Sequence, residues 1–296
     1  MSSAYWIRPM RTTDVVSVER LTAEGFYDLD GRTRRVHDPA PERRSEAKAL
    51  KWRRRMQHML DHDAGGCWVA EDVSGLVGAV AGLRRDLTWI LSAFSVQPGV
   101  QGRGIGKQLL EASMTHGRNC QRGMLASSVD PAAIRRYLLA GFTMHPTIVL
   151  SGKVSRDVLP VVERVREGSP SDIDLCDSVD RQVRDAAHGV DHQILTAMYR
   201  LVVTERTTGS GYAYVEPGGG PYLLAATNRR TATDLLWETL AASDPDTVTR
   251  IGHVTAENTW AVDVGTETRM ELGSYGYLAL QNMKPPMPYI PSGHFL

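Results

Sequence analysis

The sequence has little of what marks a disulfide-stapled or metal-clustered protein. Its 296 residues include only three cysteines, which are far apart and odd in number: Cys67, Cys120 and Cys176. Such a set predicts neither a disulfide framework nor a zinc cluster, and it fits a reducing compartment. We therefore expect a cytoplasmic protein without a metal site.

Long apolar runs are also lacking. No stretch offers the roughly 20 consecutive apolar residues that span a bilayer, and the N-terminal segment MSSAYWIRPMRTTD has neither an apolar core nor a cleavage site. The sequence therefore predicts a chain that is soluble, not obviously exported, and without a membrane partner.

An excess of charge of either sign is missing as well. Lys plus Arg and Asp plus Glu both number 34, so no global field favours nucleic acid or a polyacidic substrate. We expect no nucleic-acid partner, and any charge preference must be local. The length suits two domains of ordinary size.

The residues up to about 153 alternate between strand and helix patterns. A short strand, YWIRP, precedes a helix capped by Thr13 or Asp14, and a basic helix with an apolar stripe follows a polar loop. Three successive strand patterns, CWVAED, GLVGAVAGLRR and LTWILSAFSV, predict an antiparallel meander. After a glycine-rich joint come a helix, a strand, the helix PAAIRRYLLAGF and another strand. The fold expected is mixed α/β, with a mostly antiparallel central sheet flanked by helices.

The glycine-rich joint is FSVQPGVQGRGIGKQLL, Phe94 to Leu110. A nucleotide P-loop would need glycine at Gln101 and serine or threonine at Gln108, and dinucleotide fingerprints would need glycine at Lys107 or Leu109. What fits is Gln-x-x-Gly-x-Gly, from Gln101 to Gly106. Glycines let successive backbone N–H groups converge, and the helix start adds partial positive charge, so this joint can hold a pyrophosphate.

The joint resembles the acetyl-CoA loop of the GNAT family of N-acetyltransferases, Gln/Arg-x-x-Gly-x-Gly/Ala. The family also carries a helix of the form Asn-x-x-Ala-x-x-x-Tyr-x-x-x-Gly-Phe. The stretch DPAAIRRYLLAGF supplies Ala133, Tyr137, Gly141 and Phe142 at that spacing. Asp130 stands in place of the usual Asn, a change that keeps a helix-capping side chain.

The resemblance implies acetyl-CoA as co-substrate and assigns residues to it. Backbone N–H groups of the strand before the loop polarise the thioester carbonyl, and Tyr137 protonates the leaving thiolate. A phenol with a pKa near ~10 is a competent donor to a thiolate near ~8.5. The cofactor-binding residues implied are Phe94, Ser95, Val96, Gln101, Gly102, Arg103, Gly104, Ile105, Gly106, Lys107 and Asp130.

The general base has no clear candidate. The strand TWILSAFSV contains no Asp or Glu. The residues that could order a water or titrate near neutrality are Ser92, Ser127, Ser128, His116 and His145. Acidic residues that could hold a cationic amine precede the basic helix: Glu24, Asp28, Asp30 and Asp38.

The second part of the chain looks like a degenerate repeat of the first. Arg8 and Asp14 align with Arg166 and Asp172, and PYLLAATNRRTATDLLWETLAAS resembles the strand and helix around the joint with the glycine loop cut out. The stretch AENTWAVDVG offers Asn258 and Ala261 at the family's helix spacing, but Gly265 occupies the tyrosine position. We therefore predict a catalytic domain over residues 1–153 and a degenerate GNAT-like domain over 154–296, which binds no cofactor and walls the acceptor cleft. Its proline-rich tail should run extended over the surface or along the cleft.

The function expected is acetyl-CoA-dependent N-acetyl transfer to the primary amine of a small molecule or peptide, by direct attack on the thioester. A non-catalytic acyl-CoA sensor or regulatory protein is the alternative. A scaffold that docks a partner through the basic helix near Lys51 to Arg55 is a third. The sequence leaves open the acceptor, the acyl length and a homodimer.

Overall fold

The computed structural model describes residues 4–34 and 40–296. We call residues up to 153 the first half and residues 154–296 the second half. The helices are α1 (Val15–Thr33), α2 (Glu46–Asp63), α3 (Ile105–Met114), α4 (Pro131–Leu139), α5 (Ile173–Arg184), α6 (Asp191–Met198), α7 (Arg229–Ala241) and α8 (Thr259–Glu267). The strands of the first half are β1 (Trp6–Pro9), β2 (Cys67–Asp72), β3 (Gly75–Arg85), β4 (Thr88–Val96), β5 (Arg122–Ser127) and β6 (Thr143–Gly152). Those of the second half are β7 (Arg166–Glu167), β8 (Arg200–Thr204), β9 (Gly211–Val215), β10 (Pro221–Ala226), β11 (Thr249–Val254), β12 (Glu271–Gln281) and β13 (Tyr289–Ile290).

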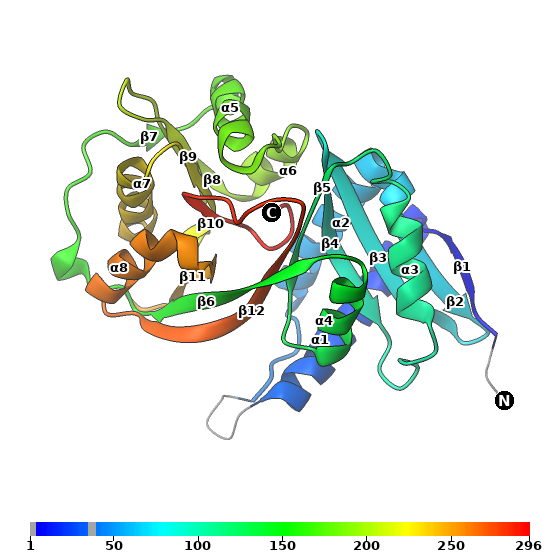
Figure 1. Ribbon diagram of the computed structural model, residues 1–296. Helices are drawn as coiled ribbons and strands as arrows, with labels where there is room; N and C mark the ends of the chain where they lie inside the picture. The colour runs from blue at the N-terminus through cyan, green and yellow to red at the C-terminus, as the bar shows by residue number, and fades with distance from the viewer. Residues whose placement is uncertain (1–3, 35–39) are drawn as a thin grey trace.

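The strands form two sheets. The larger has eight strands in the order β1-β2-β3-β4-β5-β12-β6-β11, and the smaller has five in the order β13-β10-β9-β8-β7. Within both sheets every recorded pairing is antiparallel except that of β4 with β5. Helix α3 lies in front of the larger sheet and α2 behind it (Figure 1). The expected mixed α/β fold with mostly antiparallel sheets is confirmed.

The two halves exchange one strand each, β6 of the first half and β12 of the second. Strand β12 lies between β5 and β6, pairing Leu280 with Met124 of β5 on one side and with Thr143 of β6 on the other. Strand β6 in turn lies between β12 and β11 of the second half. Figure 1 shows β6 and β12 crossing side by side from one half to the other. Each half is therefore completed by a strand of the other, and the domain boundary at residue 153 stays a prediction.

The alignment between the halves reappears as a structural repeat. The guanidinium of Arg8 donates to Asp14 at 2.7 Å, and that of Arg166 donates to Asp172 at 2.6 Å. In both places the aspartate also accepts a backbone N–H three residues earlier, at 2.8 Å, and so closes the turn that begins the following helix. The same Arg–Asp device thus orients α1 and α5.

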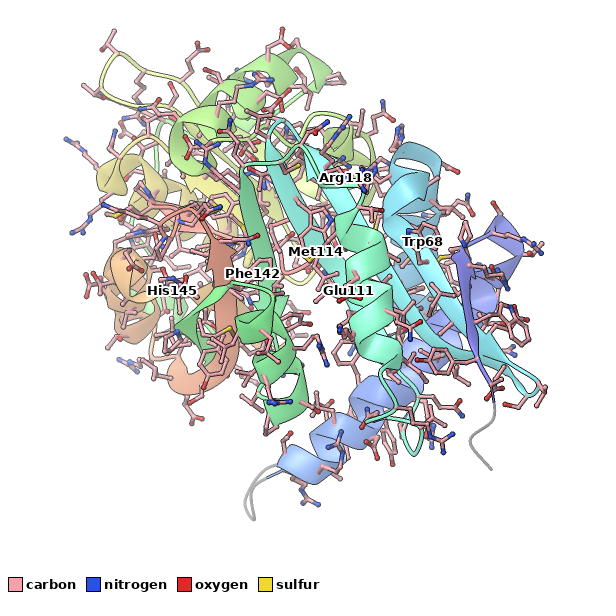
Figure 2. All side chains as sticks on the ribbon, turned by 45° about the vertical axis from the view of Figure 1, so that its right-hand side comes forward. Trp68, Glu111, Met114, Arg118, Phe142 and His145 are labelled. Carbon is pink, nitrogen blue, oxygen red and sulfur yellow. The ribbon has the colours of Figure 1, made fainter. Side chains whose placement is uncertain are left out.

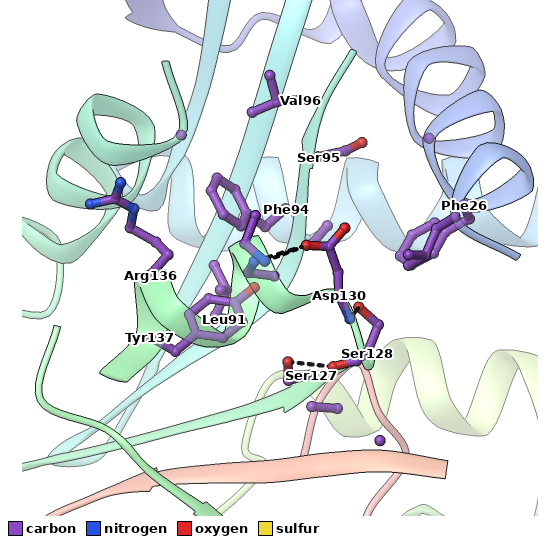
Figure 3. A pocket seen from close by; sticks show the side chains of 18 of the residues that line it. Phe26, Leu91, Phe94, Ser95, Val96, Ser127, Ser128, Asp130, Arg136 and Tyr137 are labelled. Carbon is purple, nitrogen blue, oxygen red and sulfur yellow. Dashed lines mark hydrogen bonds between the residues drawn. The ribbon is translucent and has the colours of Figure 1, made fainter. Parts of the chain in front are cut away.

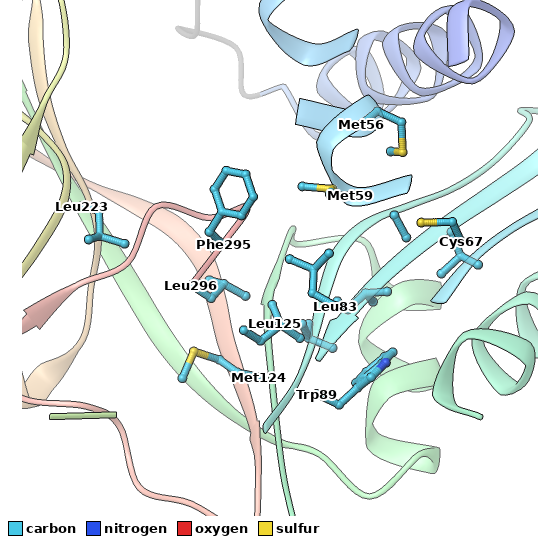
Figure 4. Packing of buried hydrophobic residues seen from close by; sticks show 14 of the residues in the cluster. Met56, Met59, Cys67, Leu83, Trp89, Met124, Leu125, Leu223, Phe295 and Leu296 are labelled. Atoms are coloured by element: carbon cyan, nitrogen blue, oxygen red, sulfur yellow. The ribbon is translucent and has the colours of Figure 1, made fainter. Parts of the chain in front are cut away.

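The C-terminal tail is an interior element. Strand β13 pairs with β10, and Phe295 and Leu296 are completely buried. Figure 4 shows these two side chains between Met59 and Leu83 of the first half and Leu223 of the second. Burial of large apolar side chains is worth about 1.5–3 kcal/mol each, which outweighs the tendency of a proline-rich segment to stay outside. From residue 288 onward the structure therefore excludes the course over the surface and agrees with the other course that the sequence allowed, along the cleft, which Gly293 and His294 line.

A buried cluster of charged side chains also joins the two halves. Arg85 of β3 contacts Asp63 at 2.8 Å and Asp191 of α6 at 2.5 Å. The His58 ring of α2 lies 3.0 Å from Asp191. Burial opposes the charge of Asp191, but hydrogen bonds from His58 and Arg85 prevail and lower its pKa to about 2. The cluster fixes α6 against the first half.

Within residues 4–34 and 40–296, none of the helices is both long and apolar enough to cross a bilayer.

Candidate active site

A cleft of about 850 Å³ opens beside β4. Its walls come from α1, from β4 and the glycine-rich joint, from the end of β5 with α4, and from the second half. Figure 3 shows Phe94, Asp130 and Tyr137 around this cavity.

The cleft exists because β4 and β5 diverge. The two strands pair in parallel only as far as Leu91 with Leu125. At Ser92 the pairing of β4 with β3 skips a residue, since Leu91 is opposite Gly82 and Ala93 is opposite Ala81. Such a bulge bends its strand and is common beside active sites. Beyond it, β4 continues to Val96 with the edge that faces the cleft unpaired among the described strands, so its backbone can bind a ligand.

The glycine-rich joint presents an open helix start to the same cleft. Gly102 and Gly104 have left-handed backbones, with φ of 81° and 88°, and Gly104 precedes α3 without a side-chain cap. A Cβ on Gly106 would lie 3.2 Å from the Phe94 ring. Gln101 ties the loop to β4 by donating to the Val96 carbonyl at 3.2 Å. The first N–H groups of α3 thus remain available for an anion.

Helix α4 closes the cleft from the other side. The Asp130 carboxylate accepts hydrogen bonds from the backbone of Ala132 at 2.7 Å and of Ala133 at 3.1 Å. The expected helix cap at Asp130 is therefore confirmed. Arg32 of α1 reaches the same carboxylate at 3.4 Å, which links α1 to the mouth of the cleft.

Tyr137 is buried on the cleft-facing side of α4. Its ring centroid lies 6.3 Å from that of Phe94 on β4. Burial, together with the charge of Asp130, raises the pKa of Tyr137 above that of an ordinary phenol. The hydroxyl therefore stays protonated at neutral pH and can donate a proton inside the cleft.

Nearly all of the residues that the sequence assigned to the cofactor come together here. Phe94 to Val96, Gln101, Gly102, Gly104 to Lys107 and Asp130 all line the cleft, as does Tyr137. Arg103 is not among the lining residues, and its carbonyl accepts a hydrogen bond from Tyr5 at 3.3 Å. The binding roles themselves stay predictions.

The candidates for proton uptake divide into two groups. Ser92, Ser127 and Ser128 line the cleft. His116 does not, because its ring bonds to Asp63 at 2.9 Å in the buried ion cluster. His145 lies on β6 (Figure 2), where its ring is 3.1 Å from the Thr143 hydroxyl, and it is not among the residues that line the cleft.

Of the acidic candidates, Asp30 lines the cleft, where burial raises its pKa. Glu24 pairs with Arg43 and Asp28 pairs with Arg32. Asp38 lies outside the described residues.

We predicted that the second half walls the cleft, but the sequence did not indicate which of its residues line it. They are His253, Ser274, Tyr275, Gly276, Gly293 and His294. They reach it because β11 and β12 both join the larger sheet and the tail passes between the halves (Figure 4). Glycines inside strand patterns do hint at bulges, and Gly276 is such a residue, but that signal does not say which wall it serves.

A second polar cluster lies inside the second half. Asp180, His188 and His192 bring potential metal-ligand atoms within 4.8 Å of one another. Hydrogen bonds engage most of these groups: His188 Nδ1 with Asp180 at 2.7 Å, Tyr212 donating to Asp180 at 2.5 Å, and His192 Nδ1 with the Tyr214 hydroxyl at 2.7 Å. His188 Nε2 is buried without a partner among the described residues. The cluster is a buried hydrogen-bond network that joins α5 and α6 to β9.

Comparison with known proteins agrees with the geometry. The family model for the acetyltransferase (GNAT) domain matches residues 63–144. No curated protein matches the sequence.

Solved structures resemble the chain over nearly its whole length. A candidate acetyltransferase from Pyrococcus horikoshii superposes with a TM-score of 0.73 at 16% identity, over 98% of this chain and 93% of its own. A GCN5-related N-acetyltransferase from Sphaerobacter thermophilus gives 0.57 at 14%, over 96% and 97%. A tandem GNAT protein from the clavulanic acid biosynthesis pathway gives 0.54 at 13%, over 94% and 98%. At such identities the likeness shows the fold alone. Residues 63–144 therefore match an acetyltransferase (GNAT) domain, and the whole chain has a fold that it shares with a tandem GNAT protein.

Proposed function

We propose that the protein transfers the acetyl group of acetyl-CoA to a primary amine of a small molecule or peptide. The observation that carries the proposal is the cleft in which an open helix start, an unpaired strand edge and a buried phenol face one space. These are the three things that a thioester with a pyrophosphate-bearing tail requires.

The residues present fit acetyl-CoA. The N–H groups from Gly104 to Lys107 would hold its pyrophosphate, because they converge at the start of α3 and add the partial charge of the helix dipole. The edge of β4 from Phe94 to Val96 would hold the extended arm, and its N–H groups would polarise the thioester carbonyl. Bound acetyl-CoA supplies the activated acyl group.

Tyr137 would complete the reaction on the thiol side. A thiolate leaves when the amine attacks the carbonyl, and the protonated phenol of Tyr137 can neutralise it inside the cleft. The raised pKa of this phenol does not prevent donation, since it keeps the proton in place until the thiolate forms.

The second half would serve this site without a cofactor of its own. We propose the division into a catalytic domain, residues 1–153, and a degenerate domain, residues 154–296, with one acetyl-CoA per chain. His253 and Tyr275 support this division of labour, because they line the cleft from the second half.

The test measures thiol release from acetyl-CoA across small amines, aminoglycosides, amino acids and peptides, together with calorimetric binding of acetyl-CoA. We expect amine-dependent release in at least one class. Binding without release across the whole panel would instead favour the acyl-CoA sensor, and absence of binding would refute both.

A further inference from the structure

The wall of the cleft opposite α4 is built by two bulges in the exchanged strands. On β11 the pairing with β6 jumps from Ile251 to Val254, and on β12 it jumps from Ser274 to Tyr277. The two irregularities lie opposite adjacent stretches of β6 that meet at Ile148. Bulges redirect side chains and are frequent near active sites, and these two turn His253 and Tyr275 into the cleft.

His253 is held there at a conformational cost. Its φ is 54°, a left-handed value that is uncommon for residues other than glycine, although histidine, like asparagine and aspartate, adopts it more often than most. Its ring meets that of Tyr275 edge-on, with centroids 4.7 Å apart. Strained backbone positions that the surroundings hold in place gather at functional sites.

Space for the ring is kept by a glycine of the tail. Gly293 has a φ of 76°, and a Cβ there would stand only 2.6 Å from His253 Nε2. Gly293 also lines the cleft, next to His294. Three separate segments of the second half, β11, β12 and the tail, thus define one position for this imidazole.

The imidazole of His253 makes no hydrogen bond that would stabilise the fold. Among the described residues, neither of its nitrogens has a hydrogen-bond partner, and Nδ1 is buried without one. A buried polar atom without a partner costs about 1–3 kcal/mol. His294 differs, because its ring lies 3.3 Å from Arg55 and 3.4 Å from Tyr222.

His253 is uncharged before the reaction, as a group that accepts a proton must be. Burial lowers its pKa to about 4. The ring is therefore neutral at physiological pH and keeps a free lone pair.

We infer that His253 receives the proton that the acceptor amine loses as it attacks the thioester, so that the second half supplies the base that the first half lacks. The inference rests on the proposed function. The amine nitrogen forms a bond to the carbonyl carbon, the carbon–sulfur bond breaks, and the electron pair leaves with sulfur. One proton passes from the amine to His253 and one from Tyr137 to the thiolate, and exchange with solvent restores both groups.

The first experiment compares His253→Asn with the matched variant His145→Asn. Asparagine tolerates a left-handed backbone, so the strand should keep its shape. With the best acceptor of the panel, we expect kcat to fall about 100-fold in His253→Asn, the usual scale for a general base. Acetyl-CoA affinity should stay within about twofold, and the His145 variant should match the wild type.

The second experiment separates proton transfer from packing. His253→Gly suits the left-handed backbone and leaves a space of imidazole size. Added imidazole should restore part of its rate, whereas it should not change Tyr137→Phe. Gly293→Ala, which displaces the ring without removing it, should lower kcat by a smaller factor with acetyl-CoA binding intact.

The outcomes distinguish this inference from the proposed function. Wild-type kcat in both His253→Asn and His253→Gly would overturn the inference and leave the acetyltransferase standing. A low rate in both that imidazole does not restore would also overturn it, because the ring would then act through packing. A wild-type protein that binds acetyl-CoA and acetylates no amine would overturn the proposed function and this inference with it.

Discussion

The two halves of the chain repeat the same order of strands and helices. They differ at three places, each of which lies at the cleft in the first half and at the equivalent position in the second. The first difference is at the joint between the fourth strand and the following helix. In the first half this joint is open, since Gly104 leaves the start of α3 uncapped. In the second half the Asn228 side chain accepts the Thr231 N–H at 3.0 Å and caps α7. The cap already engages the Thr231 N–H, one of the donors that an anion at the start of α7 would need.

The second difference is between the diverging strands. In the first half the gap beside β4 is the cleft. In the second half β13 pairs with β10 and also contacts β11, so the tail occupies the corresponding gap. Asn258, at the position of Asp130, holds the tail there by accepting the Tyr289 N–H at 2.9 Å and donating to the Pro286 carbonyl at 3.0 Å.

The third difference is at the tyrosine position. Tyr137 faces the cleft, whereas a Cβ on Gly265 would lie 2.6 Å from the Leu150 side chain of β6. The exchanged strand therefore fills the space that a second tyrosine would take. The comparison teaches that the second copy did more than lose a motif: each feature of a cofactor site there is replaced by a structural contact, and the last of these, with Leu150, comes from the first half.

The contact with the largest expected effect is the buried ion cluster between the halves. Replacing Asp191 by alanine leaves Arg85 without its main partner, and breaking such a pair costs about 3–5 kcal/mol. The exposed inter-half pair of Arg122 with Asp185, 3.3 Å apart, is the control, because losing it should cost less than about 1 kcal/mol. Urea unfolding of Asp191→Ala and Asp185→Asn measures both. Equal losses would mean that the cluster does not fasten the halves.

The lowered pKa of Asp191 also predicts that the protein loses unfolding free energy in acid. Its folded pKa of about 2 lies below the ordinary value, so its stabilising effect is complete above about pH 4 and disappears as the pH falls towards 2. The difference in unfolding free energy between the wild type and Asp191→Ala should shrink over that window. A difference independent of pH there would contradict the assignment.

The next prediction tests the open joint. Gly104→Asp places a carboxylate at a left-handed position in front of the helix start, and we expect acetyl-CoA affinity to fall about 100-fold or more, which is about 2.7 kcal/mol. The matched change in the second half, Asn228→Asp, keeps a good cap and should leave affinity unchanged. Calorimetry on both variants, with circular dichroism to verify folding, decides the matter. Unchanged binding in Gly104→Asp would remove the joint from the cofactor site.

The tyrosine position gives a third test. Tyr137→Phe should lower kcat about 100-fold, the scale for losing a general acid, with acetyl-CoA affinity little changed. Because the phenol pKa is raised, the wild-type rate should show no alkaline loss from this group below the ordinary phenol value of about 10. Wild-type turnover in the variant would mean that water or another group protonates the thiolate.

Local patterns were enough to predict the first half. The strand runs, the glycine joint and the cap at Asp130 depend on neighbours in sequence, and the Arg8–Asp14 device could be matched to Arg166–Asp172 by alignment. The strand exchange depends on pairing Leu280 with Met124, far away in the chain, and no local pattern encodes it. The position of His253 follows from that exchange, which is why the sequence offered only His116 and His145 as titrating histidines.

The smallest effect on stability is expected at the start of α7, the position in the second half that corresponds to the glycine-rich joint. Asn228→Ala removes the cap of α7 and should cost about 1 kcal/mol of stability, the usual value for an N-cap. It should not change acetyl-CoA binding, because the neighbouring gap stays filled by β13. Equilibrium titration should give one acetyl-CoA per chain in both the wild type and this variant. A second site, appearing in the variant or already present in the wild type, would show that the copy in the second half still binds cofactor and that the difference between the halves is one of degree.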